Sequence, residues 1–96
     1  MKLWLDDIRP IPDNSYTLAH SVNEAKLLIE HADNVELIDI DHDLGEFAAD
    51  GGDGIKLLDW LEETGKNCSI RLHTMNPVGR ENMRAIIQRN GWAEIK

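Results

Sequence analysis

The sequence predicts an α/β fold: a small, doubly wound and mostly parallel sheet in a single domain that spans residues 1–96. Short apolar runs of strand length alternate with segments of helical periodicity, the order expected of parallel strands joined by helices. A chain of 96 residues with 42% hydrophobic content is long enough for one core and too short for two.

The first half of the chain predicts three strands and one helix. "KLWLDD" is apolar until Asp6 and Asp7, and the two prolines that follow cannot lie inside a helix or a sheet. "SYTLAH" has strand character, and "VELIDID" is another apolar run of strand length. Between them, Ser21 and Glu24 have the spacing of a capping box. The expected strands are 2–7, 15–20 and 35–41, and the expected helix is 21–32.

The second half predicts two helices and two strands. "HDLGEFAADGGDG" is rich in turn residues, and "IKLLDWLEETG" carries an apolar stripe with Gly65 where a helix would end. "CSIRLHT" mixes apolar and β-branched residues, Pro77 and Gly91 lie at the ends of a helical segment, and "WAEIK" fits an edge strand. The expected helices are 55–65 and 76–91, and the expected strands are 68–74 and 92–96.

Charge limits the partners of the chain. Eighteen acidic residues against ten Lys and Arg give a formal charge of −8, whereas wrapping a duplex requires clustered positive charge. A phosphate-bearing small molecule or a nucleic-acid end at a metal site remains compatible, because a divalent ion reverses the local sign. Cys68 is the only cysteine and no apolar run could span a bilayer, so we expect a cytoplasmic protein without membrane contact.

Acids and bases follow three of the expected strands. Because parallel strands bring their carboxyl ends to one edge of a sheet, we expect these residues to share one rim. Carboxylates crowded there repel one another and require a positive partner. The residues are Asp6, Asp7, Asp41, His42, Asp43, His73, Thr74 and Asn76.

The motifs "LWLDDIRP", "IDHDLG" and "HTMNPVGRE", in this order and at this spacing, resemble the cyclic-phosphate processing receiver domain family over nearly the whole chain. They also resemble a trimmed response-regulator receiver. The resemblance implies a receiver-like (flavodoxin-like) fold in which Asp6, Asp7 and Asp41 hold Mg²⁺ and Asp41 occupies the phospho-acceptor position. Hard oxygen ligands suit Mg²⁺, which keeps further positions for water or phosphate oxygens.

Further residues near the same rim suggest catalysis. Histidine titrates near neutrality, so we expect His42 and His73 to give and take protons. Arginine binds phosphate oxygens in a bidentate manner. The family name implies processing of cyclic phosphates, in which activated water opens the ring. The expected phosphate-binding residues are Arg9, Thr74, Asn76 and Arg80.

The chain departs from ordinary receivers in its helices. Only "IRPIPDNS" separates Asp7 from Tyr16, which is too short for a helical crossover, and the chain stops at Lys96. We therefore expect the first and last helices of the receiver fold to be missing. Lys96 is the candidate for the lysine that receivers carry after their fifth strand, at a shorter distance than usual.

Structural roles remain open for several of these residues. His42 and His73 could be hydrogen-bonded structural histidines, and Arg9 and Arg80 could be surface charges. Asn76 could be a turn former. A turn cap explains Asp43 as well as chemistry does. Asp39 lies inside its strand, so a partnered structural carboxylate is expected there rather than a ligand.

Two other site classes fit less well. The spacing of Asp39, Asp41, Asp43 and Asp50 imitates a calcium-binding loop, but Leu44 stands where that loop requires glycine. Two-histidine phosphoesterases need Ser or Thr two places after a histidine, and none of the four histidines has one.

We therefore predict an Mg²⁺-dependent receiver-like domain that binds and hydrolyses a cyclic phosphate or a phosphorylated nucleotide or RNA end, as a metal-dependent phosphoesterase. The alternative is a stand-alone phosphoreceiver or a non-catalytic interaction module with Asp41 as phospho-acceptor. An accessory role beside a partner protein of a processing system is also compatible with the size of the chain.

Overall fold

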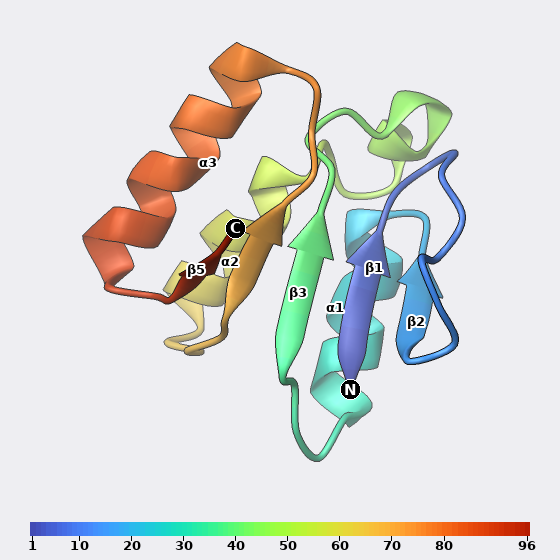
Figure 1. The fold of residues 1–96 in the computed structure, drawn as a ribbon, viewed down its shortest axis with the longest axis horizontal. Helices are drawn as coiled ribbons and strands as arrows, with labels where there is room; N and C mark the ends of the chain where they lie inside the picture. The colour runs from blue at the N-terminus through green and yellow to red at the C-terminus, as the bar shows by residue number, and fades with distance from the viewer.

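The computed structural model describes residues 1–96 and contains one sheet of five parallel strands in the order β2-β1-β3-β4-β5 (Figure 1). The predicted α/β receiver-like fold is confirmed, and each predicted strand and helix is present. The strands are β1 (Lys2–Leu5), β2 (Tyr16–Ala19), β3 (Leu37–Ile40), β4 (Ile70–Leu72) and β5 (Glu94–Ile95). The helices are α1 (Val22–His31), α2 (Ile55–Glu63) and α3 (Pro77–Asn90), with a 3₁₀ helix η1 (Gly45–Ala49).

The helices all cover the same face of the sheet. Three helical crossovers lead from β2 to β3, from β3 to β4 and from β4 to β5, in one direction across the sheet. Right-handed crossovers that run in one direction place their helices on one face. Figure 1 shows α1 and α2 behind the strands. Residues 6–15 join β1 to β2 without a helix, as predicted, so no helix crosses the opposite face.

The hydrophobic core lies between this sheet face and the helices. Alternate residues of the central strands point into it, as the two-residue period of a strand requires, and each helix contributes buried residues from one side. The strand residues are Leu3, Leu5, Ile38, Ile40 and Ile70, and the helix residues include Ala25, Ile29, Leu58, Leu61, Met83 and Ile87. None of the helices combines the length and apolar character needed to cross a membrane.

Polar caps define the helix ends near the site. The Ser21 hydroxyl accepts a 3.1 Å hydrogen bond from the Glu24 amide at the start of α1. Asn76 does the same for α3, since its side chain accepts a 3.0 Å hydrogen bond from the Gly79 amide, with Pro77 at the first helical position. The start of α3 is therefore fixed beside the carboxyl end of β4.

Candidate functional site

Three carboxylates meet at the carboxyl ends of two neighbouring strands. Asp6 and Asp7 follow β1 and Asp41 follows β3, which pairs with β1 in the sheet. Each residue offers one oxygen atom, and these atoms all lie within 4.8 Å of one another. The structure therefore brings together the three residues that the sequence suggests as metal ligands.

Asp6 is held in place by several donors. It is 1% exposed, and its Oδ1 accepts 2.9 Å hydrogen bonds from the amides of Ile8 and Arg9. Burial raises the pKa of Asp6, but the backbone donors of Arg9 and Ile8 and the bond to His73 outweigh it, so the pKa lies below its usual value. Asp6 is therefore ionised near neutral pH.

Asp41 is less well compensated. Burial raises its pKa, and the charge of Asp6 raises it further, against the opposing hydrogen bond with the Thr74 hydroxyl. Its Oδ1 also accepts a 2.8 Å hydrogen bond from the His42 amide. The pKa of Asp41 is raised overall, first by burial and then by the charge of Asp6.

Gly45 makes room for Asp7. Its φ is 55°, in the left-handed region, and a Cβ placed there would lie 2.7 Å from the Asp7 Oδ2. The glycine of "IDHDLG" thus allows both the turn and the close approach of a carboxylate. Beside it lies a cavity of about 390 Å³ that is lined by Asp7, Ile8, Arg9, Asp41, Asp43, Gly45, Thr74, Met75 and Asn76.

Three of the four expected phosphate-binding residues line this cavity. Arg9 donates from Nη1 to the His73 carbonyl oxygen at 3.0 Å, which directs the guanidinium group across from β1 to β4. Asn76 donates from its backbone amide to the Thr74 hydroxyl at 3.1 Å. Arg80, the fourth, is not in the lining, and its guanidinium group donates to the Thr74 carbonyl oxygen.

His73 lies behind the acidic cluster rather than in the cavity. Its Nε2 is 2.9 Å from Asp6 Oδ2 and its Nδ1 is 2.6 Å from Asp39 Oδ1. The ring stacks on Trp4 with 3.9 Å between the centroids and an angle of 1°. Each ring nitrogen of His73 therefore contacts a different buried carboxylate. His73 thus links Asp6 to Asp39 behind the acidic cluster.

Asp39 has the structural environment that its position inside a strand suggests. It is 0% exposed, and besides His73 it accepts a 3.3 Å hydrogen bond from the Tyr16 hydroxyl. Arg71 Nη1 lies 4.0 Å away. Asp39 is therefore a partnered carboxylate beneath the site, and it does not belong to the group of potential metal ligands.

His42 points toward α3. Its Nδ1 is 2.8 Å from Asp43 Oδ1, and its ring is so close to Gly79 that a Cβ there would lie 2.5 Å from Cγ. His42, Asp43 and Asp53 form a second group whose potential ligand atoms lie within 4.8 Å of one another. Asp53, which was not predicted from the sequence as a site residue, accepts a 3.1 Å hydrogen bond from the Leu44 amide.

Lys96 lies apart from the acidic cluster. Its Nζ is 3.2 Å from Glu94 Oε2 on β5, and its side chain is 76% exposed. No contact joins it to Asp6, Asp7 or Asp41. Lys96 therefore makes no ion pair with the three carboxylates.

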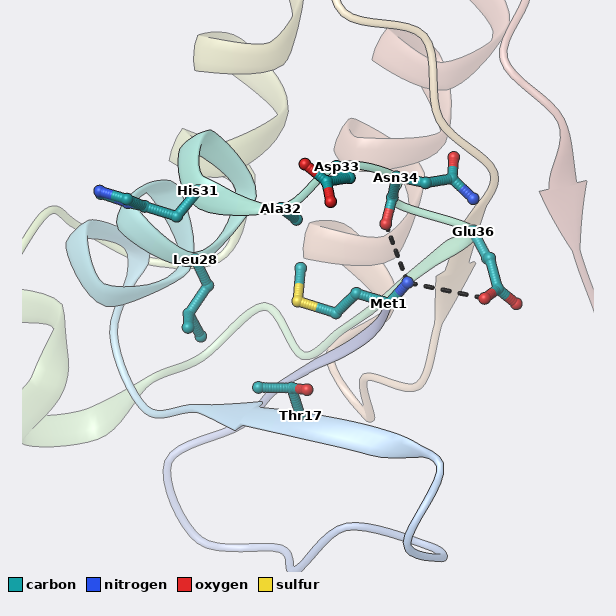
Figure 2. Close-up of a pocket in the computed structure, with 8 residues that line it drawn as sticks. All are labelled: Met1, Thr17, Leu28, His31, Ala32, Asp33, Asn34 and Glu36. Carbon is teal, nitrogen blue, oxygen red and sulfur yellow. Dashed lines mark hydrogen bonds and ion pairs between the residues drawn. The ribbon is translucent and has the colours of Figure 1, made fainter.

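The largest cavity lies at the opposite end of the sheet. Its volume is about 610 Å³, and Figure 2 shows the amino group of Met1 in its wall. That group donates to the Asn34 carbonyl oxygen at 2.8 Å and lies 3.6 Å from Glu36 Oε1. This cavity lies at the amino ends of the strands and has no cluster of potential metal ligands, so we place the candidate site at the acidic end.

A parallel sheet of this strand order, with paired acids after β1, an aspartate after β3 and a threonine after β4, defines a receiver-type domain. Residues 1–89 match the family described as the cyclic-phosphate processing receiver domain. The chain belongs to that family, which confirms the resemblance seen in its motifs. No curated protein and no solved structure matches the chain.

Proposed function

We propose that this domain binds Mg²⁺ through Asp6, Asp7 and Asp41, and that it binds and hydrolyses a cyclic phosphate or a phosphorylated nucleotide or RNA end. The observation that carries the proposal is the convergence of these three carboxylates beside a cavity. Asp7 and Asp41 line this cavity together with Arg9, Thr74 and Asn76. Hydrolysis of a cyclic phosphate adds water across one P–O bond of the ring, so that the phosphorus gains a hydroxyl group and the leaving oxygen gains a proton.

The carboxylates fit a magnesium ion. Their donor atoms are hard oxygens that lie within 4.8 Å of one another, and octahedral Mg–O bonds of about 2.1 Å place ligand oxygens roughly 3–4 Å apart. The pKa of Asp41 is raised first by burial and then by the charge of Asp6, and a bound cation would favour its ionised form. Bound Mg²⁺ would neutralise the carboxylates and polarise a phosphate oxygen.

The donors around the cavity suit a phosphate group. The Arg9 guanidinium and the Asn76 side-chain amide carry several N–H donors, and the Thr74 hydroxyl, which contacts Asp41, lies beside them. Arg80 contributes by fixing the Thr74 backbone through its bond to the carbonyl oxygen. These residues would orient the phosphate against the acidic cluster.

The two histidines remain our candidates for proton transfer. His73 does not line the cavity, and both of its ring nitrogens already contact carboxylates. His42 contacts Asp43, which lines the cavity, and its hydrogen bond lowers the pKa of Asp43. The pair of His42 and Asp43 is therefore closer to a ligand in the cavity than His73 is.

The test is to incubate the purified domain with Mg²⁺ and a panel of nucleoside 2′,3′-cyclic monophosphates and to follow ring opening by ³¹P NMR. We expect product that disappears with EDTA and in Asp41→Ala. Asp33→Ala, which removes the same charge from the opposite end of the sheet, should retain the activity. Absence of product from every cyclic phosphate, together with unchanged Mg²⁺ binding in Asp41→Ala, would refute the proposal.

A second candidate is a phosphoreceiver, favoured by the position of Asp41 after β3 and by its hydrogen bond with the Thr74 hydroxyl. Intact-mass spectrometry after exposure to a small phosphodonor separates the two functions. A stable added phosphoryl group that is absent in Asp41→Asn would favour the receiver role. A partner protein of a processing system stays a prediction under either function.

A further inference from the structure

A second cavity adjoins the acidic one. Its volume is about 340 Å³, and three residues, Asp7, Ile8 and Gly45, line both cavities. Glu46 and Phe47 from η1 complete the second cavity. Cavities of about 300–1,000 Å³ hold small organic ligands in proteins, so the two together can hold a ligand larger than phosphate.

Exposed apolar side chains gather at this end of the molecule. Ile8 is 84% exposed, Met75 is 78% exposed and Phe47 is 42% exposed, and all three line one of the two cavities. Single exposed apolar residues are common, whereas a group of them around one hollow is typical of a binding site. Four of the six large exposed apolar side chains follow the carboxyl ends of strands, and these are Ile8, Phe47, Met75 and Val78.

Contacts hold the backbone at Ile8 and the ring of Phe47 on the two sides of the second cavity. The amides of Ile8 and Arg9 donate to Asp6 Oδ1 at 2.9 Å, which holds the backbone beneath the Ile8 side chain. The Phe47 ring stacks on His20 with 5.0 Å between centroids and an angle of 18°. A flat apolar group entering the cavity would meet surfaces that are already ordered.

The charge of the second cavity excludes a second phosphate. Asp7 and Glu46 lie in its wall, and no Lys, Arg or His lines it. Aromatic side chains such as Phe47 bind nucleic-acid bases by stacking, which requires no charge on the base. The second cavity therefore suits an uncharged, flat group.

We propose that the cavity between Ile8 and Phe47 binds the base of a nucleoside monophosphate whose phosphate lies at the acidic cavity. The inference rests on the proposed function and narrows its substrate class to phosphates that carry a nucleic-acid base. Ile8, in the wall shared by both cavities, would contact the ligand where its sugar joins the two parts.

The test compares two probes by isothermal titration calorimetry in the presence of Mg²⁺: adenosine 3′-monophosphate, and methyl riboside 3-phosphate, which lacks the base. We expect the nucleotide to bind at least about tenfold more tightly. Ile8→Ala and Phe47→Leu should each weaken the nucleotide about three- to tenfold and leave the base-free probe unchanged. Leu27→Ala, at an exposed apolar position on α1, is the matched control and should change neither affinity.

The outcomes separate this inference from the proposed function. If both probes bind equally and Ile8→Ala changes neither affinity, the base site is refuted while the phosphate site stands. The base site is likewise refuted if Ile8→Ala weakens both probes to the same degree. If the wild-type domain binds neither probe, the phosphate site and the base site are both refuted.

Discussion

Two buried acids at this edge of the sheet share His73 as a hydrogen-bonding partner. Its ring lies between Asp6 and Asp39, two carboxylates of which neither is more than 1% exposed. Trp4 covers one face of the ring by stacking. Burying a carboxylate without a partner costs far more free energy than burying one with a partner. The imidazole therefore contributes to the stability of the fold as well as to the candidate site.

Replacing His73 should therefore cost stability. In His73→Leu, Asp6 and Asp39 keep their burial but lose the ring that contacts both of them, and we expect a loss of about 3–5 kcal/mol in the free energy of unfolding. Urea denaturation at neutral pH measures it. Adding Asp39→Asn to His73→Leu should restore part of the loss, because one uncompensated charge is removed.

His31→Leu is the control for this prediction, since His31 is exposed and bonds only to the Leu27 carbonyl oxygen of its own helix. A cost for His73→Leu no larger than that for His31→Leu would show that the two carboxylates do not depend on the ring.

At the same scale, the structural role of Asp39 was predictable and its partners were not. Its place inside an apolar strand indicates a partnered carboxylate, which is confirmed by its hydrogen bonds. The partner His73 is 34 residues away, and its other contact, Asp6, is 67 residues from it. Such pairings depend on which strands lie side by side, and local sequence patterns carry no information on that.

Among the elements, the strands and helices were predictable because their signals are local. Apolar runs, the Ser21 cap and the Gly91 end each act within a few residues. The short helix η1 lies in a stretch whose residues are typical of turns, so the helix was not predicted. The position of its residue Phe47 in the wall of a cavity was not predicted either. All three α-helices cover one face of the sheet because of the strand order. Local sequence patterns do not reveal that order.

The turn before α2 should tolerate no side chain at Gly54. A Cβ there would lie 2.0 Å from the backbone oxygen of Asp41 and 2.8 Å from Ile40 Cγ2. Because the nearest atom is backbone, it cannot move without displacing the end of β3. We expect Gly54→Ala to lose at least about 3 kcal/mol of unfolding free energy, as overpacking in tight sites does.

Gly91→Ala is the matched comparison. Gly91 has φ 68° but nothing within 4 Å of the added Cβ, so only backbone strain opposes the change, at about 1–2 kcal/mol. Urea midpoints of the two variants should therefore differ clearly. Equal losses would mean that the approach of Gly54 to Asp41 is looser than the structure describes.

For the whole molecule, acid should reduce stability. Several carboxylates have folded-state pKa values below their ordinary values of 3.8 for Asp and 4.5 for Glu, among them Glu94, whose pKa is lowered first by its hydrogen bond with Arg84. The unfolded chain then binds more protons, so the stability that these groups add is complete above their ordinary pKa values and is lost as the pH falls through the folded-state values. The other such groups are Asp6, Asp13, Asp43, Asp50 and Glu62.

Urea midpoints measured from pH 7 to about 2.5 should fall below about pH 4.5, with modest contributions from the exposed pairs. Glu94→Gln should flatten the decline, since its pairing with Arg84 no longer titrates. The pKa of Asp41 is raised, due first to burial, so protonation of Asp41 favours the folded state and opposes the loss of stability in acid. A midpoint that rises on acidification would contradict the balance of these shifts.

Magnesium should stabilise the folded chain through its acidic end. A ligand that binds only the folded state at a hundred times its Kd adds about 2.7 kcal/mol, which is a rise in Tm of roughly 10–20 °C for a domain of this size. Because a chain of charge −8 also gains from simple screening, the comparison is made against NaCl at equal ionic strength. Asp41→Asn should raise Tm without Mg²⁺, since folding penalises the ionised Asp41, and it should lose most of the Mg²⁺ increment. Asp33→Asn is the control and should keep the Mg²⁺ increment in Tm. Equal increments in the wild type and both variants would mean that magnesium acts on the overall charge and not on the three carboxylates.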